Sequence, residues 1–235
     1  MIIRKKGNIF TTKCQTIVNT INCVGVMGAG IAYEFRLRDP EMFEQYKVLC
    51  SRKQLEVGKL WIYNTKVEST AYAKILNFPT KYDWKYPSKE EYLHQGLQKF
   101  VDTHEAKGIS SIAFPLLGAD KGGLGSEKSI AIMEKYLSNL NIDVEIWEFD
   151  PFASDDLFEY FTSIFIEIDD DTIKKESKIR IDLVKKVRAA LDSGNIYSLS
   201  GLLRVKGIGD VTLEKLFTYI RTYKNKNITL FNYIS

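Results

Sequence analysis

The chain has 235 residues, of which 45% are hydrophobic and 12% aromatic, as is typical of a protein that buries one large core or two smaller ones. It has three cysteines and two histidines but no Cys-x-x-Cys pair, which argues against a disulfide framework and a zinc site. No apolar run approaches the ~20 residues that cross a bilayer, and the apolar part of the basic N-terminus is too short for a signal peptide. We therefore expect a cytoplasmic protein that needs no metal or cofactor and binds no membrane.

Charge is distributed unevenly along the chain, whose net charge is +3. Residues 172–235 hold 13 Lys and Arg against 5 Asp and Glu, a charge of +8, whereas residues 1–171 hold 20 against 25, a charge of −5. An acidic body with a basic tail indicates two modules that have different partners.

Strand-like and helix-like segments alternate through the first part of the chain, the pattern of a layered α/β domain. The expected strands are residues 1–5, 16–20, 60–63, 74–77, 111–115 and 143–149. The expected helices are residues 31–50, 89–107 and 126–140. Ser88, with Glu91 three residues later, suggests a capping box at the start of the second helix.

A polar, charge-dense segment, EIDDDTIKKESK at residues 167–178, has the composition of a linker. We therefore divide the chain into a domain of residues 1–166, this linker, and a small all-α module of residues 179–235. Within the module, helices are expected at residues 181–191 and 212–223.

Two glycine-rich segments each follow an apolar strand and precede a helix. The first is NTINCVGVMGAGIA at residues 19–32, and the second is FPLLGADKGGLGS at residues 114–126. Glycine lets main-chain N–H groups approach an anion closely, and helix N-termini favour negative charge. At the carboxyl ends of a sheet, two such loops could hold a diphosphate between them. Two independent tight turns are the alternative.

Five segments together resemble the macrodomain family. They are GNIF (7–10), the first glycine segment, NFPTK (77–81), FPLLGADKGGL (114–124) and EIWEFDP (145–151). The combination looks most like the branch that contains the DNA ADP-ribosyl glycohydrolase antitoxin DarG and the terminal ADP-ribose protein glycohydrolases. This resemblance implies a three-layer α/β/α fold around a mixed sheet, ADP-ribose as the ligand, and an ADP-ribosyltransferase toxin as a candidate partner.

The resemblance also implies a set of ligand-binding residues. By position they are Asn8, Ile9, Asn19, Asn22, Gly25, Val26, Met27, Gly28, Gly30, Ile31, Thr80, Leu117, Gly118, Ala119, Lys121, Gly122, Gly123, Leu124 and Phe149. Asn8 would lie at the adenine, with Phe149 or the nearby Phe152 as its aromatic neighbour. Asn22 would contact the distal ribose.

In the glycohydrolase branch, catalysis depends on the lysine at the position of Lys81. A lysine amine whose pKa is lowered can attack the anomeric carbon of a ribose, and a charged lysine can instead stabilise a leaving group. Without the resemblance, a solvated loop lysine is the default interpretation. Asn22 and Asp120 complete the expected catalytic set, with Asp120 as a general base, a stabiliser of positive charge or a solvated side chain. Ala29 stands where many DarG-like relatives carry lysine.

The basic tail contains SLSGLLRVKGIGDVTLEKLFTYIRTYK at residues 198–224, which resembles the helix–hairpin–helix motif. In that motif the glycine hairpin offers main-chain amides to a DNA phosphate. The residues expected to contact nucleic acid are Arg204, Lys206, Gly207 and Gly209, with Lys185, Lys186 and Arg188 on the preceding helix. A helical hairpin that packs or contacts a partner protein is the alternative.

The resemblance and the tail together predict an ADP-ribosyl hydrolase that removes ADP-ribose from thymidine in DNA or from glutamate in protein. Two other classes remain open. One is a module that binds ADP-ribose or a nucleotide metabolite without cleaving it, and the other is an adaptor whose tail contacts a partner protein.

Overall fold

The computed structural model describes residues 1–66 and 71–234. The chain forms two compact units, Met1–Asp150 and Pro151–Ser235, so the division falls before the expected boundary at residue 166. Ser235, the last residue of the expected helical module, lies outside the described residues. In the described ranges, no helix is both long and apolar enough to cross a membrane.

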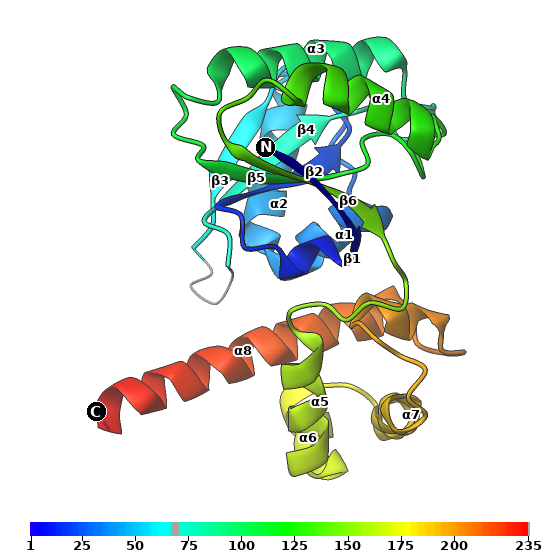
Figure 1. Cartoon of the computed structure of the whole chain (residues 1–235). Helices are drawn as coiled ribbons and strands as arrows, with labels where there is room; N and C mark the ends of the chain where they lie inside the picture. The colour runs from blue at the N-terminus through cyan, green and yellow to red at the C-terminus, as the bar shows by residue number, and fades with distance from the viewer. Residues whose placement is uncertain (67–70, 235) are drawn as a thin grey trace. The chain divides into compact units, whose positions relative to one another are not determined.

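A six-stranded sheet forms the centre of the first unit (Figure 1). Its strands are β1 (Ile2–Gly7), β2 (Thr16–Ile21), β3 (Trp61–Asn64), β4 (Lys74–Pro79), β5 (Ser111–Pro115) and β6 (Asp143–Phe149). Their order is β1-β6-β5-β2-β4-β3, and each pair is parallel except β3 with β4. All six lie where the sequence predicts strands, so the mixed sheet is confirmed.

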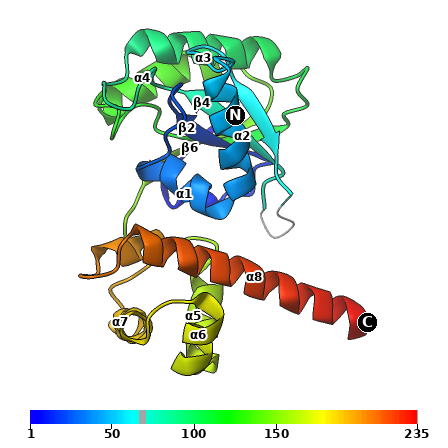
Figure 2. The same cartoon turned by 180° about the vertical axis from the view of Figure 1, so that it is seen from behind.

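Helices cover both faces of this sheet, which confirms the three-layer α/β/α fold (Figures 1 and 2). The pair on one face is α1 (Gly30–Arg38) and α2 (Pro40–Ser51), and the pair on the other is α3 (Glu90–Thr103) and α4 (Ser126–Leu137). A short 3₁₀ helix, η1 (Ile9–Thr11), follows β1.

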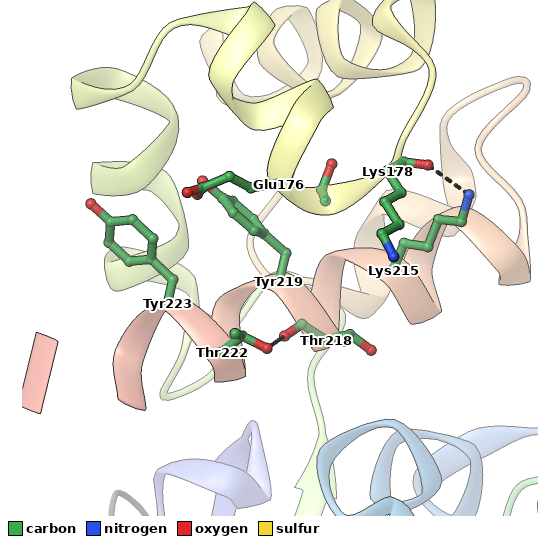
Figure 3. Close-up of a pocket in the computed structure, with 8 residues that line it drawn as sticks. Glu176, Lys178, Lys215, Thr218, Tyr219, Thr222 and Tyr223 are labelled. Carbon is green, nitrogen blue, oxygen red and sulfur yellow. Dashed lines mark hydrogen bonds between the residues drawn. The ribbon is translucent and has the colours of Figure 1, made fainter. Parts of the chain in front are cut away.

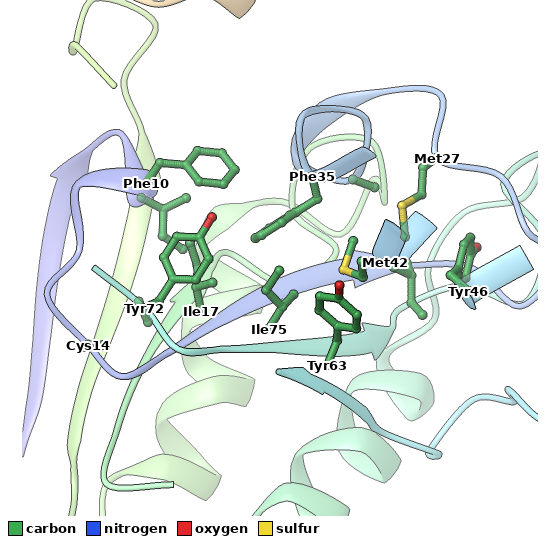
Figure 4. Close-up of a cluster of buried hydrophobic side chains, with 14 of the residues drawn as sticks. Phe10, Cys14, Ile17, Met27, Phe35, Met42, Tyr46, Tyr63, Tyr72 and Ile75 are labelled. Carbon is green, nitrogen blue, oxygen red and sulfur yellow. The ribbon is translucent and has the colours of Figure 1, made fainter. Parts of the chain in front are cut away.

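The two faces have separate hydrophobic cores because successive strand residues point to opposite sides of a sheet. Ile17 of β2 packs in one cluster with Phe35 of α1 and Tyr46 of α2 (Figure 4). Its neighbour Val18 belongs to the second cluster, together with Leu97 of α3. All five side chains are 0% exposed, and burying each one stabilises the fold by about 1.5–3 kcal/mol. The central strand β2 is thus fixed on both faces just before the first glycine segment begins.

The predicted helix over residues 31–50 is in fact two helices separated at Asp39. Pro40 lies in the first turn of α2, where its missing N–H leaves no hydrogen bond unmade. The Asp39 carboxylate accepts a hydrogen bond from the Met42 N–H at 2.9 Å and so caps α2. A residue before proline avoids the helical region, which is why α1 ends here.

Ser88 does not cap α3, so the predicted capping box is wrong. Lys89 is the N-cap residue, and it makes no side-chain capping bond. Ser88 is buried instead, and its N–H donates to the carbonyl of Gly122 at 2.9 Å. This tertiary contact satisfies a buried main-chain group and joins the start of α3 to the second glycine segment.

The second unit is built from helices, as the sequence predicts for the tail. They are α5 (Phe158–Glu167), α6 (Asp170–Ser177), α7 (Ile181–Asp192), the 3₁₀ helix η2 (Ser200–Arg204) and α8 (Asp210–Ile234). Each contributes apolar side chains that are at most 1% exposed: Phe161, Ile173, Val184, Leu202 and Leu213. The unit therefore has a hydrophobic core of its own.

The segment that resembles a linker is helical over most of its length. Asp169 caps α6 by accepting hydrogen bonds from the N–H groups of Asp171 and Thr172 at 3.1 and 3.0 Å. Ile173 is the one residue of this helix that reaches 0% exposure. Because a short surface helix buries only one face, its composition can match that of a linker. The sequence also does not predict α5, which precedes it.

Candidate functional site

The first glycine segment begins in the last residues of β2, and the Asn22 side chain shapes the loop that follows. Its Oδ1 accepts hydrogen bonds from the N–H groups of Val24 and Val26 at 3.0 and 3.3 Å. The Tyr46 hydroxyl also donates to Oδ1 at 2.9 Å, and Nδ2 donates to the Val26 carbonyl at 2.5 Å. One amide hydrogen is left for a ligand, so most of the hydrogen-bonding capacity of Asn22 positions the loop.

This segment ends at an open helix N-terminus. Gly28, Ala29 and Gly30 are exposed, no side chain caps α1, and its first turn has no acidic residue. The free N–H groups and the dipole at such an end favour an anion. Gly25 and Gly30 have φ angles of +83° and +58°, where glycine is favoured, so the path of the segment depends on them.

The second glycine segment folds tightly between β5 and α4. The Gly118 carbonyl accepts the Leu124 N–H at 3.0 Å. A methyl group at Gly122 would lie 2.3 Å from the Gly118 carbonyl oxygen, so only glycine fits there. Gly118 and Gly123 also have φ angles of +67° and +79°. The glycines thus maintain a close turn that side chains would open.

Lys81 is hydrogen-bonded to both glycine segments. It follows β4, and its Nζ donates to the Lys121 carbonyl in the second segment. The carbonyl of Tyr82 accepts the Cys23 N–H, in the first segment, at 2.9 Å. Partial burial of the amine lowers the pKa of Lys81. In the part of the chain that the structure describes, no carboxylate pairs with this amine to oppose that effect.

Asn8 and Phe149 lie together at the ends of β1 and β6, where Gly7 pairs with Phe149. The Asn8 Oδ1 accepts the Phe10 N–H at 3.2 Å, which fixes the orientation of the amide. Its Nδ2 is buried and has no hydrogen-bond partner among the described residues. An unpaired buried donor is costly, so it suggests a place for a ligand acceptor such as a ring nitrogen. The Phe149 ring is 64% exposed and can stack on a base.

Several expected ligand-binding residues have their side chains in the core. Asn19 and Leu117 are 0% exposed and Met27 is 1% exposed. The Asn19 Nδ2 donates to the Asn77 Oδ1 at 2.9 Å across β2 and β4. These side chains offer a ligand almost no surface, so they hold the strands and loops in place. The same applies largely to Ile9 and Thr80, which are 7% and 5% exposed.

The remaining expected residues lie at the surface of the two glycine segments. Those whose side chains are partly or fully exposed are Val26, Ile31, Ala119, Asp120, Lys121 and Leu124. Phe152 belongs to the second unit, where its ring packs edge-on against Tyr197 with centroids 5.9 Å apart. Phe149 is therefore the aromatic residue that the first unit itself places beside Asn8.

Sequence reasoning missed three residues that shape this site. Tyr46 holds Asn22, while the main-chain N–H groups of Cys23 and Ser88 tie the segment around Lys81 to the two glycine segments. Burial raises the pKa of Tyr46, so its hydroxyl remains a donor. In a sequence, a tyrosine at an apolar helical position predicts only packing. Main-chain hydrogen bonds such as those of Cys23 and Ser88 do not depend on side-chain identity, so the sequence does not predict them.

Comparisons with known proteins all relate the first unit to macrodomain proteins. The Macro domain family model matches residues 18–133. The "DNA ADP-ribosyl glycohydrolase" of Thermus aquaticus is 35% identical over 147 residues, which are 62% of this chain and 40% of that protein. The solved macrodomain of Mycobacterium tuberculosis DarG is 36% identical with a TM-score of 0.60, over 63% of this chain and 97% of that one. The chain belongs to the macrodomain family.

A third similar protein is Thermosipho africanus DarTG, solved in complex with ADP-ribose. It is 32% identical with a TM-score of 0.57, over 61% of this chain and 40% of that one. This chain spans about two fifths of the length of the curated relatives, 40% of one and 36% of another. The residues that the family model matches all lie within the first unit, which is therefore the macrodomain.

The hairpin of the second unit is a separate candidate site, for nucleic acid. Gly207 has a φ of +94°, and the Ile208 N–H donates to the Val205 carbonyl at 3.0 Å, which closes a tight turn. The Gly209 carbonyl accepts the Thr212 N–H at 3.0 Å in the first turn of α8. The hairpin therefore leads directly into the N-terminus of a long helix, where main-chain N–H groups favour an anion.

Three basic side chains lie around this hairpin. Arg204 and Lys206 are exposed on either side of Val205. The Lys186 Nζ lies 2.9 Å from the position that a methyl group at Gly207 would take, so α7 brings an amine to the turn. The hairpin is thus flanked by three positive charges, two from its own segment and one from α7.

Arg188 differs from that expectation, because it is a structural residue. Its Nε pairs with the Asp170 carboxylate at 2.8 Å, and its guanidinium also donates to the carbonyls of Phe165 and Ile168. A half-buried arginine with these partners holds α7 against the segment between α5 and α6. It has little left to offer a phosphate.

A pocket of about 270 Å³ opens between α6 and α8 in the second unit (Figure 3). Its lining residues are Glu176, Ser177, Lys178, Lys215, Thr218, Tyr219, Thr222 and Tyr223. The Lys215 Nζ donates to the Lys178 carbonyl at 2.7 Å, and burial raises the pKa of Tyr219. None of the residues expected to bind ADP-ribose lines this pocket.

Proposed function

We propose that the chain is a DNA ADP-ribosyl glycohydrolase whose macrodomain binds ADP-ribose and whose Lys81 carries the chemistry. The observation that supports this most directly is the place of Lys81: its partly buried amine donates to the second glycine segment, and its main chain contacts the first. The similar proteins of Thermus aquaticus and Mycobacterium tuberculosis are named DNA ADP-ribosyl glycohydrolases. One similar structure contains ADP-ribose.

ADP-ribose would span the edge of the sheet where the strands end. The adenine lies at Asn8 and Phe149, where an unpaired amide donor and an exposed ring are available. The diphosphate lies between the N-terminus of α1 and the second glycine segment. The distal ribose then reaches Lys81, with Asn22 shaping the loop beside it.

In the reaction, the neutral Lys81 amine donates its lone pair to the anomeric carbon of the distal ribose. The bond from that carbon to the DNA base breaks as the new C–N bond forms, and the leaving base takes the bonding pair. The amine loses a proton, which the base receives. Water then displaces the amine, which releases ADP-ribose with a free hydroxyl and restores Lys81. A charged Lys81 that stabilises the leaving base is the alternative role.

The basic second unit supports DNA as the molecule that carries ADP-ribose. Its hairpin would contact phosphates through main-chain N–H groups and through Arg204, Lys206 and Lys186, independently of sequence and sensitive to salt. A glycohydrolase needs an enzyme that attaches the group it removes. An ADP-ribosyltransferase toxin is therefore the partner that we propose.

The test incubates the chain and a Lys81→Ala variant with an oligonucleotide that bears ADP-ribose on thymidine and with a protein that bears it on glutamate. Mass spectrometry follows the release of ADP-ribose. We expect release from DNA by the unaltered chain, and no release by the variant. Lys99→Ala is the matched control, because Lys99 is exposed on α3.

The other outcomes identify the alternatives. Release from glutamate alone would make protein the substrate. Release from neither, with ADP-ribose still bound in calorimetry, would exclude the enzyme and leave a module that binds ADP-ribose.

A further inference from the structure

Three large aromatic side chains lie on the surface directly after Lys81. Tyr82, Trp84 and Tyr86 are 60%, 53% and 67% exposed, and they alternate along one short segment, residues 82–86. Exposed large apolar side chains that cluster mark interaction sites more often than isolated ones do. We propose that this aromatic segment binds the single-stranded DNA on either side of the modified nucleotide, by stacking bases on the rings.

The aromatic segment has a defined backbone. The Asp83 carboxylate accepts the Lys85 N–H at 3.0 Å, and the Asp83 carbonyl accepts the Tyr86 N–H at 3.2 Å, which together form a turn. The Cys23 N–H ties Tyr82, at one end, to the first glycine segment, and the N–H of Ser88, two residues beyond the other end, bonds to the second. Because the turn is already formed, stacking a base on it costs less conformational entropy than ordering a flexible loop would.

The aromatic segment lies next to Lys81 in the chain, and its relation to the reaction rests on the proposed function. Lys81 acts on the bond that joins the ribose to the base, so the DNA strand must pass close to it. Trp84 is three residues further along the chain, and their Cα atoms are therefore within about 11 Å of each other. Nucleotides that neighbour the modified one would come within reach of the rings.

The charges of this region fit a nucleic acid. Residues 82–89 contain two lysines, Lys85 and Lys89, and one aspartate, which already accepts the Lys85 N–H. The Lys85 Nζ lies 5.8 Å from the centroid of the Trp84 ring, so a cation and a stacking surface stand side by side. Proteins that bind single strands combine these two features. A duplex hides the faces of its bases, which is why a single strand is the occupant that we choose.

A binding experiment tests the aromatic segment independently of catalysis. The three tryptophans of the chain, Trp61, Trp84 and Trp147, all belong to the macrodomain, and Trp84 is 53% exposed whereas Trp147 is 8% exposed. Trp61 is partly exposed, so Trp84 is the most exposed of the three; tryptophan fluorescence therefore reports mainly on this segment and contains no signal from the basic second unit. The chain is titrated with an unmodified oligothymidine and with a duplex of the same length.

We expect saturable quenching by the single strand and much weaker quenching by the duplex. A Tyr82→Ala/Tyr86→Ala double variant keeps Trp84 as the reporter and should bind the single strand at least about tenfold more weakly, because stacking contributes ~1–3 kcal/mol per base. Val48→Ala, at an exposed apolar position on α2, is the matched control and should leave the affinity unchanged. Thermal unfolding shows whether the double variant is folded.

A kinetic experiment adds the link to the reaction. We expect kcat/KM to be higher for ADP-ribosyl thymidine within an oligonucleotide than for the same modification on a single nucleotide, and the double variant to lose that difference. Equal quenching by strand and duplex, or none by either, would overturn the inference even if both substrates are cleaved. If only the single strand quenches the fluorescence and neither substrate is cleaved, the inference holds, but the proposed glycohydrolase activity is contradicted.

Discussion

The Lys81 amine donates a hydrogen bond to the main-chain carbonyl of Lys121, so residues that are far apart in the sequence meet at one point. A carbonyl acceptor holds the amine in place without adding the negative charge that would favour its protonated form. Partial burial lowers the pKa of Lys81, which increases the neutral fraction of the amine near neutral pH.

The pH dependence of the reaction should identify the role of this amine. If neutral Lys81 is the nucleophile, kcat/KM rises with pH and levels off above an inflection that lies below the ~10.4 of an ordinary lysine. Steady-state rates of ADP-ribose release across the pH range measure it. Lys81→Arg, which stays charged, should bind ADP-ribose yet release almost none. A rate that falls as pH rises would instead favour a charged Lys81 that stabilises the leaving base.

Gly122 and Gly123 are neighbours that should differ sharply in their tolerance of alanine. A methyl group at Gly122 meets the Gly118 carbonyl oxygen at 2.3 Å, whereas at Gly123 no atom lies within 4 Å. Gly123→Ala is then left with only the strain of its φ of +79°, about 1–2 kcal/mol. Calorimetry should show a loss of ADP-ribose affinity above about tenfold for Gly122→Ala and a smaller loss for Gly123→Ala. Equal losses would contradict the steric argument.

Glu145 should contribute to stability in a way that acid removes. Burial by itself would raise the pKa of Glu145, but hydrogen bonds from Lys5, Thr12 and Trp147, at 2.5, 2.6 and 2.8 Å, outweigh it and lower the pKa. Because the pKa is lower in the folded state, the ionised carboxylate stabilises the fold at pH values above the unfolded-state pKa of ~4.3. This stabilisation is lost as pH falls through the folded-state pKa.

We expect Glu145→Gln to lower the free energy of unfolding by about 2 kcal/mol at neutral pH. Urea denaturation at neutral pH and in acid measures the difference from the unaltered chain. The difference should shrink in acid, because the carboxyl of the unaltered chain is then protonated as well. A difference that is constant with pH would mean that charge plays no part.

Substitutions of Lys206 and Arg188 should change different properties of the second unit: the first its DNA binding, the second its stability. Lys206 is exposed at the hairpin, so Lys206→Ala should reduce the slope of log affinity for DNA against log salt by about 1. Arg188 pairs with Asp170 and with main-chain carbonyls, so Arg188→Ala should lower the unfolding temperature of the unit. DNA titrations at several salt concentrations, together with calorimetric melting, measure both effects. If Lys206→Ala leaves the salt slope unchanged, the hairpin lysine does not contact DNA.

The elements that the sequence predicts well are those with a strong local signal. The six strands are short apolar runs bounded by turn residues, and α4, α7 and the two glycine segments lie where expected. The apolar pattern of residues 31–50 predicts one continuous helix, whereas Asp39 and Pro40 divide it into two, and this Asp-Pro signal is also local. Ser88 is different, since nothing in its neighbours shows that Gly122 accepts its N–H.

By itself, the sequence determined the layered α/β class and the basic helical tail, because periodicity and charge are properties of neighbouring residues. Its motifs also carry the macrodomain resemblance, and the expected role of Lys81 comes from that resemblance. The tertiary structure alone decided that Asn19 and Leu117 are buried, that Arg188 is structural and that Tyr46 shapes the site. It also decided that the segment bearing Lys81 joins the two glycine segments. Burial and main-chain hydrogen bonds depend on what the rest of the chain brings near a residue, and the residue's own sequence neighbours do not contain that information.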